Sequence, residues 1–168
     1  MPAEQQHDYI EYVRSRISRL HHVAYLVLGD ADRADDAVQN ALTVLYRRWP
    51  RMTEVDNLDA YVHTMVVRAC LSERRRPWSA VLLGGRAPDR PVDGGSDTVD
   101  DRLAIRAALD RLPERQRIVV VLRFLCDLPV AEVARLLGRS EGTIKSRTAT
   151  GLAALRRSLA PRLSRSAP

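Results

Sequence analysis

Residues 130–149 read VAEVARLLGRSEGTIKSRTA, which has the spacing of two short helices joined by a tight turn. The fifth position, where two such helices cross closely, is the small residue Ala134. The ninth is Gly138, which tolerates the positive φ that a sharp turn requires. The fifteenth is the apolar Ile144, which can anchor the second helix on the first. Three constrained positions satisfied together predict a helix-turn-helix, with a plain helical hairpin as the alternative.

The second helix of this motif is the part that would meet DNA. In a helix-turn-helix the N-terminal residues of the second helix enter the major groove. Arg147 can donate two hydrogen bonds to a guanine. Arg147 and Lys145 can equally bind phosphate groups, and phosphate contacts position a protein on DNA without distinguishing its base sequence. The candidate DNA-binding residues are Ser140, Glu141, Thr143, Lys145, Ser146, Arg147 and Thr150.

The composition agrees with a nucleic-acid partner. The 168 residues include 27 basic and 21 acidic side chains, for a net charge of +6, and every basic residue except Lys145 is arginine. The arginine fork suits phosphates and guanine edges, although membrane-surface and acidic-protein binders share a basic excess. No apolar run approaches the roughly 18 residues of a membrane span, and the N-terminus is not a signal peptide. These features predict a cytoplasmic protein without membrane insertion.

The sequence pattern predicts an all-α protein with two small helical domains joined by a flexible linker. Residues 77–98, PWSAVLLGGRAPDRPVDGGSDT, hold three prolines and two Gly-Gly pairs, which oppose both helix and strand. We therefore place domains at residues 5–76 and 99–159, with a tail at 160–168. Apolar residues recur at helical spacing on both sides of the linker.

The helix boundaries follow from caps and breakers. Gly29 can end the first helix, Asp30 can cap the second, and either Asp56 or Asn57 can cap the third. Beyond the linker we expect helices over 99–112, 114–126, 130–137 and 141 to about 159. Pro113 and Pro129 fit helix starts, and Ser140 can cap the last helix.

Two segments resemble bacterial RNA polymerase sigma factors. Residues 24–49, AYLVLGDADRADDAVQNALTVLYRRW, resemble region two. Residues 109–156, LDRLPERQRIVVVLRFLCDLPVAEVARLLGRSEGTIKSRTATGLAALR, resemble region four. Their order and spacing are similar to the compact extracytoplasmic-function (group IV) class, in particular its actinobacterial SigE-like branch. The likeness covers roughly residues 5–76 and 99–159.

The resemblance implies a mechanism. Region two would dock on the β′ clamp helices of core RNA polymerase and would melt the minus-ten promoter element. Region four would read the minus-thirty-five element and rest on the β flap, and an anti-sigma factor is an expected further partner. The implied polymerase-binding residues are Asp35, Asp36, Gln39 and Asn40, whose alternative role is a solubilising helix face. The loop Trp49–Asp56 and the following helix match the minus-ten reader, with candidates Arg51, Asn57, His63, Thr64 and Arg68.

Two other classes of protein fit less well. A conventional helix-turn-helix repressor or activator would normally dimerise, and it leaves residues 5–76 without a role. An enzyme lacks support, because the adjacent His21 and His22 face different sides of a helix and His7 and His63 have no acidic partner at ligand spacing. The sequence also shows no phosphate-binding glycine loop. We therefore expect a non-enzymatic protein with no metal and no cofactor.

Overall fold

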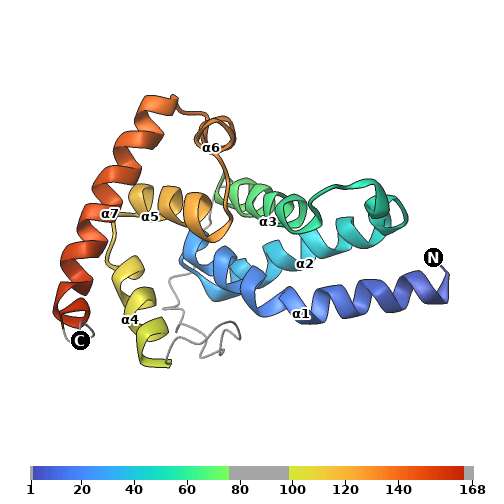
Figure 1. Ribbon diagram of the computed structural model, residues 1–168. Helices are drawn as coiled ribbons and strands as arrows, with labels where there is room; N and C mark the ends of the chain where they lie inside the picture. The colour runs from blue at the N-terminus through green and yellow to red at the C-terminus, as the bar shows by residue number, and fades with distance from the viewer. Residues whose placement is uncertain (1, 76–98, 165–168) are drawn as a thin grey trace. The chain divides into compact units, whose positions relative to one another are not determined.

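The structure is a computed structural model that describes residues 2–75 and 99–164 (Figure 1). The chain divides into two compact units, Met1–Asp93 and Gly94–Pro168. All regular elements in the described ranges are helices, as the all-α prediction requires. The predicted linker, residues 77–98, lies outside the described residues.

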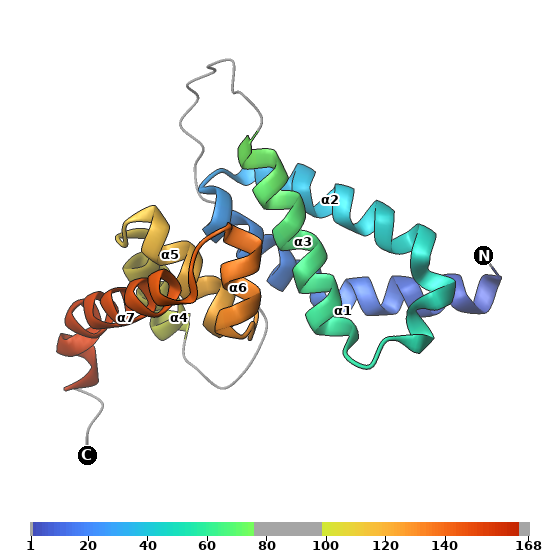
Figure 2. The ribbon, with the colours of Figure 1, turned by 90° about the horizontal axis from the view of Figure 1, so that it is seen from above.

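The N-terminal unit is built from α1 (Ala3–Leu28), α2 (Ala31–Arg48), the 3₁₀ helix η1 (Trp49–Glu54) and α3 (Leu58–Arg75). Gly29 ends α1 in the left-handed conformation, at φ 72°. The side chain of Asp30 then caps α2 by accepting a hydrogen bond of 2.9 Å from the backbone N–H of Arg33. Both boundary predictions are confirmed, and α3 packs against both helices of the resulting hairpin (Figure 2).

Aliphatic side chains fill the core of this unit, in keeping with an aromatic content of only 5% in the whole chain. Each of the three helices contributes a stripe at helical spacing, so the core is shared among them. Its fully buried members are Leu20, Val23, Leu26, Val27, Val38, Leu45, Val62, Val66 and Val67.

The segment expected to be a loop at Trp49–Asp56 is largely ordered helix, so that prediction was wrong. η1 starts with Trp49 and Pro50 and is held to the unit by the buried side chain of Met52. The ring of Trp49 also meets Tyr9 edge-on and lies against Tyr12, at centroid distances of 5.3 and 5.4 Å. These apolar anchors explain why a short polar segment is helical here.

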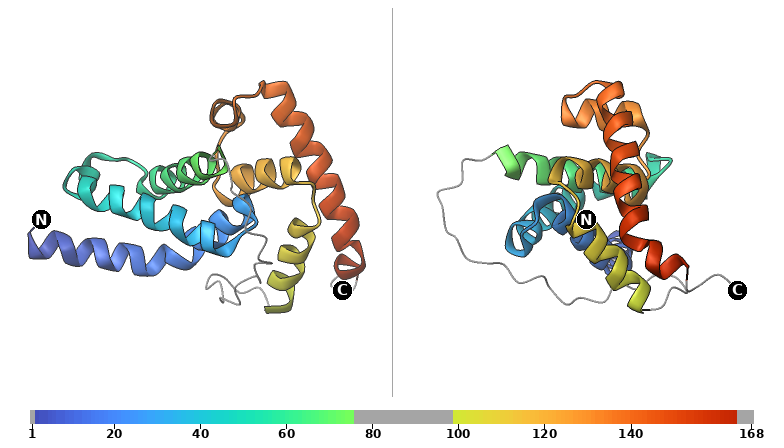
Figure 3. Two further views of the ribbon diagram at one scale, coloured as in Figure 1. Left: turned by 180° about the vertical axis from the view of Figure 1, so that it is seen from behind. Right: turned by 90° about the vertical axis from the view of Figure 1, so that its left-hand side faces the viewer.

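The C-terminal unit is built around the long helix α7 (Glu141–Leu163). α4 (Val99–Asp110), α5 (Glu114–Val120) and α6 (Val130–Leu137) all contact α7, with α6 beside its start and α4 near its end (Figure 3). α7 continues to Leu163 through Pro161, instead of ending near Leu159 as predicted, and so enters the predicted tail.

The helix predicted over residues 114–126 is interrupted. α5 ends at Val120 and is followed by one turn of π-helix, η2 (Val121–Leu125), closed by a hydrogen bond of 3.1 Å from Cys126 N–H to Val121 C=O. The wider turn keeps Leu122 and Cys126 buried, while Phe124 is 50% exposed. A regular helical period does not anticipate this change of register.

The close approach of α5 and α7 depends on Gly151. A Cβ atom at this position would lie 2.8 Å from Cγ2 of the buried Val120. We therefore expect Gly151→Ala to destabilise the C-terminal unit by about 1–3 kcal/mol, through overpacking. Chemical unfolding of the full chain will measure this change.

Gly142 provides the matched control, because a Cβ there would meet nothing closer than Ser140 Oγ at 3.9 Å. Gly142→Ala is expected to leave stability unchanged or to raise it by up to about 1 kcal/mol, since alanine favours helix more than glycine does. Equal effects of the two substitutions would show that the α5–α7 contact does not require glycine.

Candidate nucleic-acid interface

The helix-turn-helix has the geometry that its spacing predicts. α6 and α7 cross with Ala134 7% exposed and Ile144 0% exposed. Gly138 adopts the left-handed conformation at φ 61°, and the backbone N–H of Arg139 closes the turn on Ala134 C=O at 3.0 Å. All three positional constraints are confirmed, so the N-terminal part of α7 is held on α6 with its outer side in solvent.

Three candidate DNA-binding side chains also stabilise α7. The hydroxyl of Ser140 accepts a hydrogen bond of 3.2 Å from Thr143 N–H, which confirms the predicted cap, and it lies 2.9 Å from the hydroxyl of Thr143. The hydroxyl of Thr150 donates to Ser146 C=O at 2.9 Å. A contact of these groups with DNA would either replace these hydrogen bonds or use the remaining capacity of the hydroxyls.

The remaining candidates on α7 are more available to a partner. Glu141, Lys145 and Ser146 are exposed, and Arg147 is half-buried. Within residues 2–75 and 99–164, neither Lys145 nor Arg147 forms an ion pair or a side-chain hydrogen bond. The start of α7 therefore presents two cations that are free to bind phosphate or a base edge.

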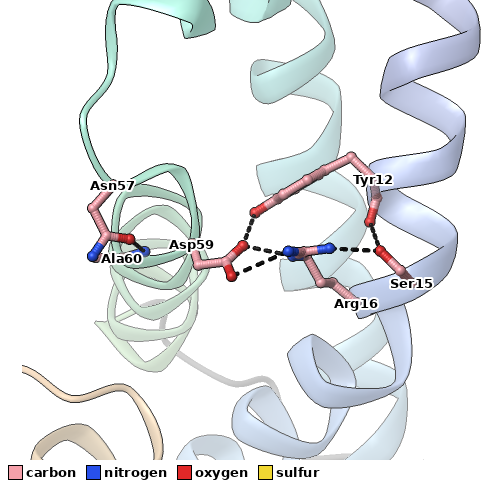
Figure 4. Close-up of polar contacts among 6 residues, drawn as sticks. All are labelled: Tyr12, Ser15, Arg16, Asn57, Asp59 and Ala60. Carbon is pink, nitrogen blue, oxygen red and sulfur yellow. Dashed lines mark hydrogen bonds and ion pairs between the residues drawn. The ribbon is translucent and has the colours of Figure 1, made fainter.

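The N-terminal candidates lie on η1, at the start of α3 and farther along α3. Asn57 caps this helix, because its Oδ1 accepts a hydrogen bond of 3.0 Å from the backbone N–H of Ala60 (Figure 4). Arg51, Asn57 and Arg68 are exposed, and Thr64 is half-buried. This set provides cations and an amide on one unit, which suits contacts to a DNA strand.

His63 does not share this exposure. It is 8% exposed, and its Nε2 is buried without a hydrogen-bond partner in the described part of the chain. Burial lowers the pKa of His63 below its ordinary value, and the charge of Arg19 lowers this pKa further while Asp59 opposes the change. A neutral, buried imidazole packs α3 against its neighbours, so the structure argues against a DNA contact by His63.

The predicted polymerase-binding residues lie on α2. Asp36, Gln39 and Asn40 are exposed, whereas Asp35 is half-buried and lies 2.8 Å from Nδ1 of His21 on α1. An exposed face of acid and amide groups fits a docking surface, and it equally fits a helix face that faces water. Sequence reasoning did not anticipate that Asp35 also joins α1 to α2.

The histidines have more acidic neighbours than the sequence indicated. His7 Nε2 lies 3.6 Å from Glu11 on α1, which corrects the expectation that His7 has no acidic partner. The described residues nonetheless contain no group of three or more His, Cys, Asp or Glu side chains that can hold a metal ion. Among the same residues no helix is long and apolar enough to cross a membrane.

Comparison with known proteins explains why the chain has these two units. Residues 12–80 match the family described as Sigma-70 region 2, and residues 102–155 match Sigma-70, region 4. The ECF RNA polymerase sigma factor SigM of Mycobacterium tuberculosis is 32% identical over 157 residues, which cover 94% of this chain and 80% of SigM. The chain belongs to the extracytoplasmic-function (ECF) family of RNA polymerase sigma factors.

Other relatives of this sigma factor agree. The RNA polymerase sigma-E factor of Streptomyces coelicolor is 33% identical over 159 residues, covering 92% of this chain and 88% of the relative. Among solved structures, the sigma factor RpoE in complex with the anti-sigma factor NepR from Bartonella quintana matches with a TM-score of 0.62 and 23% identity, over 90% of this chain and 96% of RpoE. At that identity the structural match supports the fold alone.

The residues of this sigma factor that sequence reasoning missed lie between α1 and α3. Tyr12 and Arg16 on α1 both bind Asp59 at the start of α3, next to the candidate Asn57. The partners are 47 and 43 residues apart in the sequence, so no local motif joins them. Only the packing of region 2 brings this cluster together.

Proposed function

We propose that this sigma factor binds core RNA polymerase and directs it to promoters through two separate DNA contacts. The start of α7 reads the minus-thirty-five element in the major groove, and the start of α3 contacts the minus-ten element. The observation that carries the proposal is the helix-turn-helix crossing at Ala134 and Ile144, which leaves Lys145 and Arg147 available on α7. The chain has no catalytic role in this proposal, since the chemistry belongs to the polymerase.

The minus-ten contact uses residues of η1 and α3. Arg51 and Arg68 supply cations for the DNA backbone, while Asn57 and Thr64 supply polar groups for an unstacked base. His63 is not included, because its side chain is buried. Residues 77–98 form the tether between the two reading units.

The docking surface for the polymerase is the exposed face of α2. Asp36, Gln39 and Asn40, with the partly exposed Asp35, would meet the β′ clamp helices, and region four would rest on the β flap. Acidic groups on such a face favour a basic partner surface and speed its association. A protein with this role acts in the cytoplasm, where core RNA polymerase transcribes DNA.

An anti-sigma factor is a further proposed partner. The solved structures similar to this chain include RpoE in complex with the anti-sigma factor NepR, and CnrH in complex with the cytosolic domain of CnrY. CnrH matches with a TM-score of 0.54 at 18% identity, over 96% of this chain and 91% of CnrH. Because this chain shares the fold of RpoE and CnrH, we propose that an anti-sigma factor binds it as well.

Run-off transcription on a promoter library tests the proposed function. We expect promoter-specific transcripts only when the chain is mixed with core polymerase. A conventional repressor or activator would instead shift duplex DNA by itself, and it would not direct core polymerase to new start sites. Absence of specific transcripts from the reconstituted mixture would refute the proposal.

Arg147→Ala is expected to weaken use of the minus-thirty-five element, because it removes a cation from the groove-facing side of α7. If Arg147 forks onto a guanine, discrimination at that base falls by roughly 5- to 150-fold. Transcription from promoters with single substitutions in this element will measure the change.

Arg157→Ala is the matched control, because Arg157 is exposed on the same helix but lies farther from its N-terminus. It should leave the ranking of the promoters unchanged. Unchanged promoter ranking and strength in Arg147→Ala would reject the role of Arg147.

A further inference from the structure

The carboxylate of Asp59 joins α3 to α1 through a compact hydrogen-bond network. Its Oδ1 accepts from the Tyr12 hydroxyl at 2.8 Å and from Nε of Arg16 at 2.5 Å, while its Oδ2 accepts from Nη2 of Arg16 at 3.3 Å (Figure 4). Nη1 of Arg16 donates to the Ser15 hydroxyl at 2.7 Å, and Ser15 donates to Tyr12 C=O at 2.8 Å. Each side chain of this Tyr12–Arg16–Asp59 network is thus fixed by at least one other.

Electrostatics keeps every member of the network in the required protonation state. The hydrogen bond from Arg16 holds the pKa of Asp59 below its ordinary value, and the bond from Tyr12 adds to this effect. Burial, followed by the hydrogen bond to Asp59, raises the pKa of Tyr12. The guanidinium of Arg16 also lies 4.5 Å from the centroid of the Tyr12 ring. Asp59 is therefore ionised and both of its donors keep their protons near neutral pH.

The network fixes the segment that enters α3. Asp59 lies in the first turn of this helix, and Asn57 caps the same turn through Ala60 N–H. Because the backbone from Asn57 to Ala60 is one hydrogen-bonded turn, holding Asp59 also holds the exposed amide of Asn57. α1 thereby sets the position of Asn57, one residue of the proposed minus-ten contact.

Stability alone does not account for such an arrangement. The side chains of Arg16 and Asp59 are 40% and 51% exposed, so solvent screening weakens the contribution of their ion pair to folding. A two-point arginine–carboxylate contact does restrict geometry strongly. The network is therefore better suited to positioning a neighbouring group than to holding the domain together.

We propose that Tyr12, Arg16 and Asp59 are positioning residues for minus-ten recognition. They act on DNA through the first turn of α3 and the amide of Asn57, and they need not touch the DNA themselves. This inference rests on the proposed function of the α3 start as the minus-ten reader. It adds α1 residues to a site that would otherwise consist of η1 and α3 alone.

The test compares holoenzymes containing Tyr12→Phe or Asp59→Asn with a matched control. Tyr9→Phe also removes one hydroxyl from α1, but the hydroxyl of Tyr9 donates to Leu42 C=O on α2, at 3.0 Å, and does not reach α3. Run-off transcription is measured on promoters with single-base substitutions in the minus-ten or in the minus-thirty-five element. Core binding and thermal unfolding are recorded for each variant.

We expect Asp59→Asn to reduce discrimination in the minus-ten element by about threefold to tenfold, the size expected for the net loss of one ordinary hydrogen bond. Tyr12→Phe should give a smaller loss in the same direction. Discrimination in the minus-thirty-five element and core binding should stay unchanged in both variants. Tyr9→Phe should leave both elements unaffected.

A double variant separates positioning from unrelated effects. Arg16→Gln and Asp59→Asn remove two sides of one contact, so together they should lose no more discrimination than the worse single variant. Unchanged minus-ten discrimination in Asp59→Asn, additive losses in the double variant, or an equal loss in Tyr9→Phe would each overturn the inference. A wild-type holoenzyme without minus-ten discrimination would instead refute the proposed function, and the inference with it.

Discussion

Replacing Asp35 and Asp36 with arginine is expected to abolish the association of this sigma factor with core RNA polymerase. Both residues lie on the α2 face that we propose as the docking surface. Charge reversal places like charges against a basic partner, and such a mismatch costs several kcal/mol at an interface. Co-purification of the tagged variant with core enzyme measures the loss directly.

The structure calls for a second variant, because Asp35 also lies 2.8 Å from His21 on α1. Asp36→Arg combined with Gln39→Arg leaves that contact intact and alters only exposed positions. Glu4→Arg combined with Gln6→Arg is the control, since it also replaces one acid and one glutamine with arginine, at exposed positions of α1. Normal core binding by the Asp36 and Gln39 variant would exclude this face as the docking surface.

The helix-turn-helix could be predicted because each of its constraints is local. Ala134, Gly138 and Ile144 lie within one short segment, and each satisfies a separate physical requirement: close approach, positive φ and an apolar anchor. The caps at Asp30, Asn57 and Ser140 are equally local, because a capping side chain bonds to the backbone three residues ahead. Such features are visible in the sequence without knowledge of the tertiary fold.

Features that depend on distant segments could not be predicted in this way. The helical period of α3 places His63 next to the apolar stripe, and only the packing of neighbouring helices decides that it is buried. The pairing of Asp59 with Tyr12 and Arg16 needs α1 beside α3, which no spacing within either helix reveals. The π-helical turn η2 likewise accompanies the burial of both Leu122 and Cys126, and this burial depends on the packing of the whole unit.

The same distinction separates the two DNA contacts. The proposed minus-thirty-five reader sits on a motif whose crossing residues, Ala134, Gly138 and Ile144, all lie within α6, α7 and the turn between them. The proposed minus-ten reader is supported from α1, through residues more than forty positions earlier in the chain. Substitutions of Tyr12 or Arg16 should therefore affect only the minus-ten contact, whereas the minus-thirty-five contact depends on the crossing of α6 and α7.

Ile144→Asp is expected to disrupt the crossing of α6 and α7. The side chain of Ile144 is 0% exposed where α7 packs on α6, so the substitution buries a carboxylate with no partner. An unpaired buried charge costs several kcal/mol, a large share of the roughly 5–15 kcal/mol that stabilises a typical folded protein. Loss of the unfolding transition of the C-terminal unit, monitored by circular dichroism and hydrogen exchange, will show the effect.

Two controls make this result specific to the crossing. Ala149→Asp adds the same charge at an exposed position of α7 and should change stability by no more than about 0.5 kcal/mol. Ile144→Val keeps an apolar anchor and should cost about 0.5–1.5 kcal/mol. Ile144→Asp retains every groove-facing side chain of α7. If this variant loses discrimination in the minus-thirty-five element and Ile144→Val does not, those side chains act only while α6 supports them. Retained discrimination in Ile144→Asp would mean that DNA is read elsewhere on the protein.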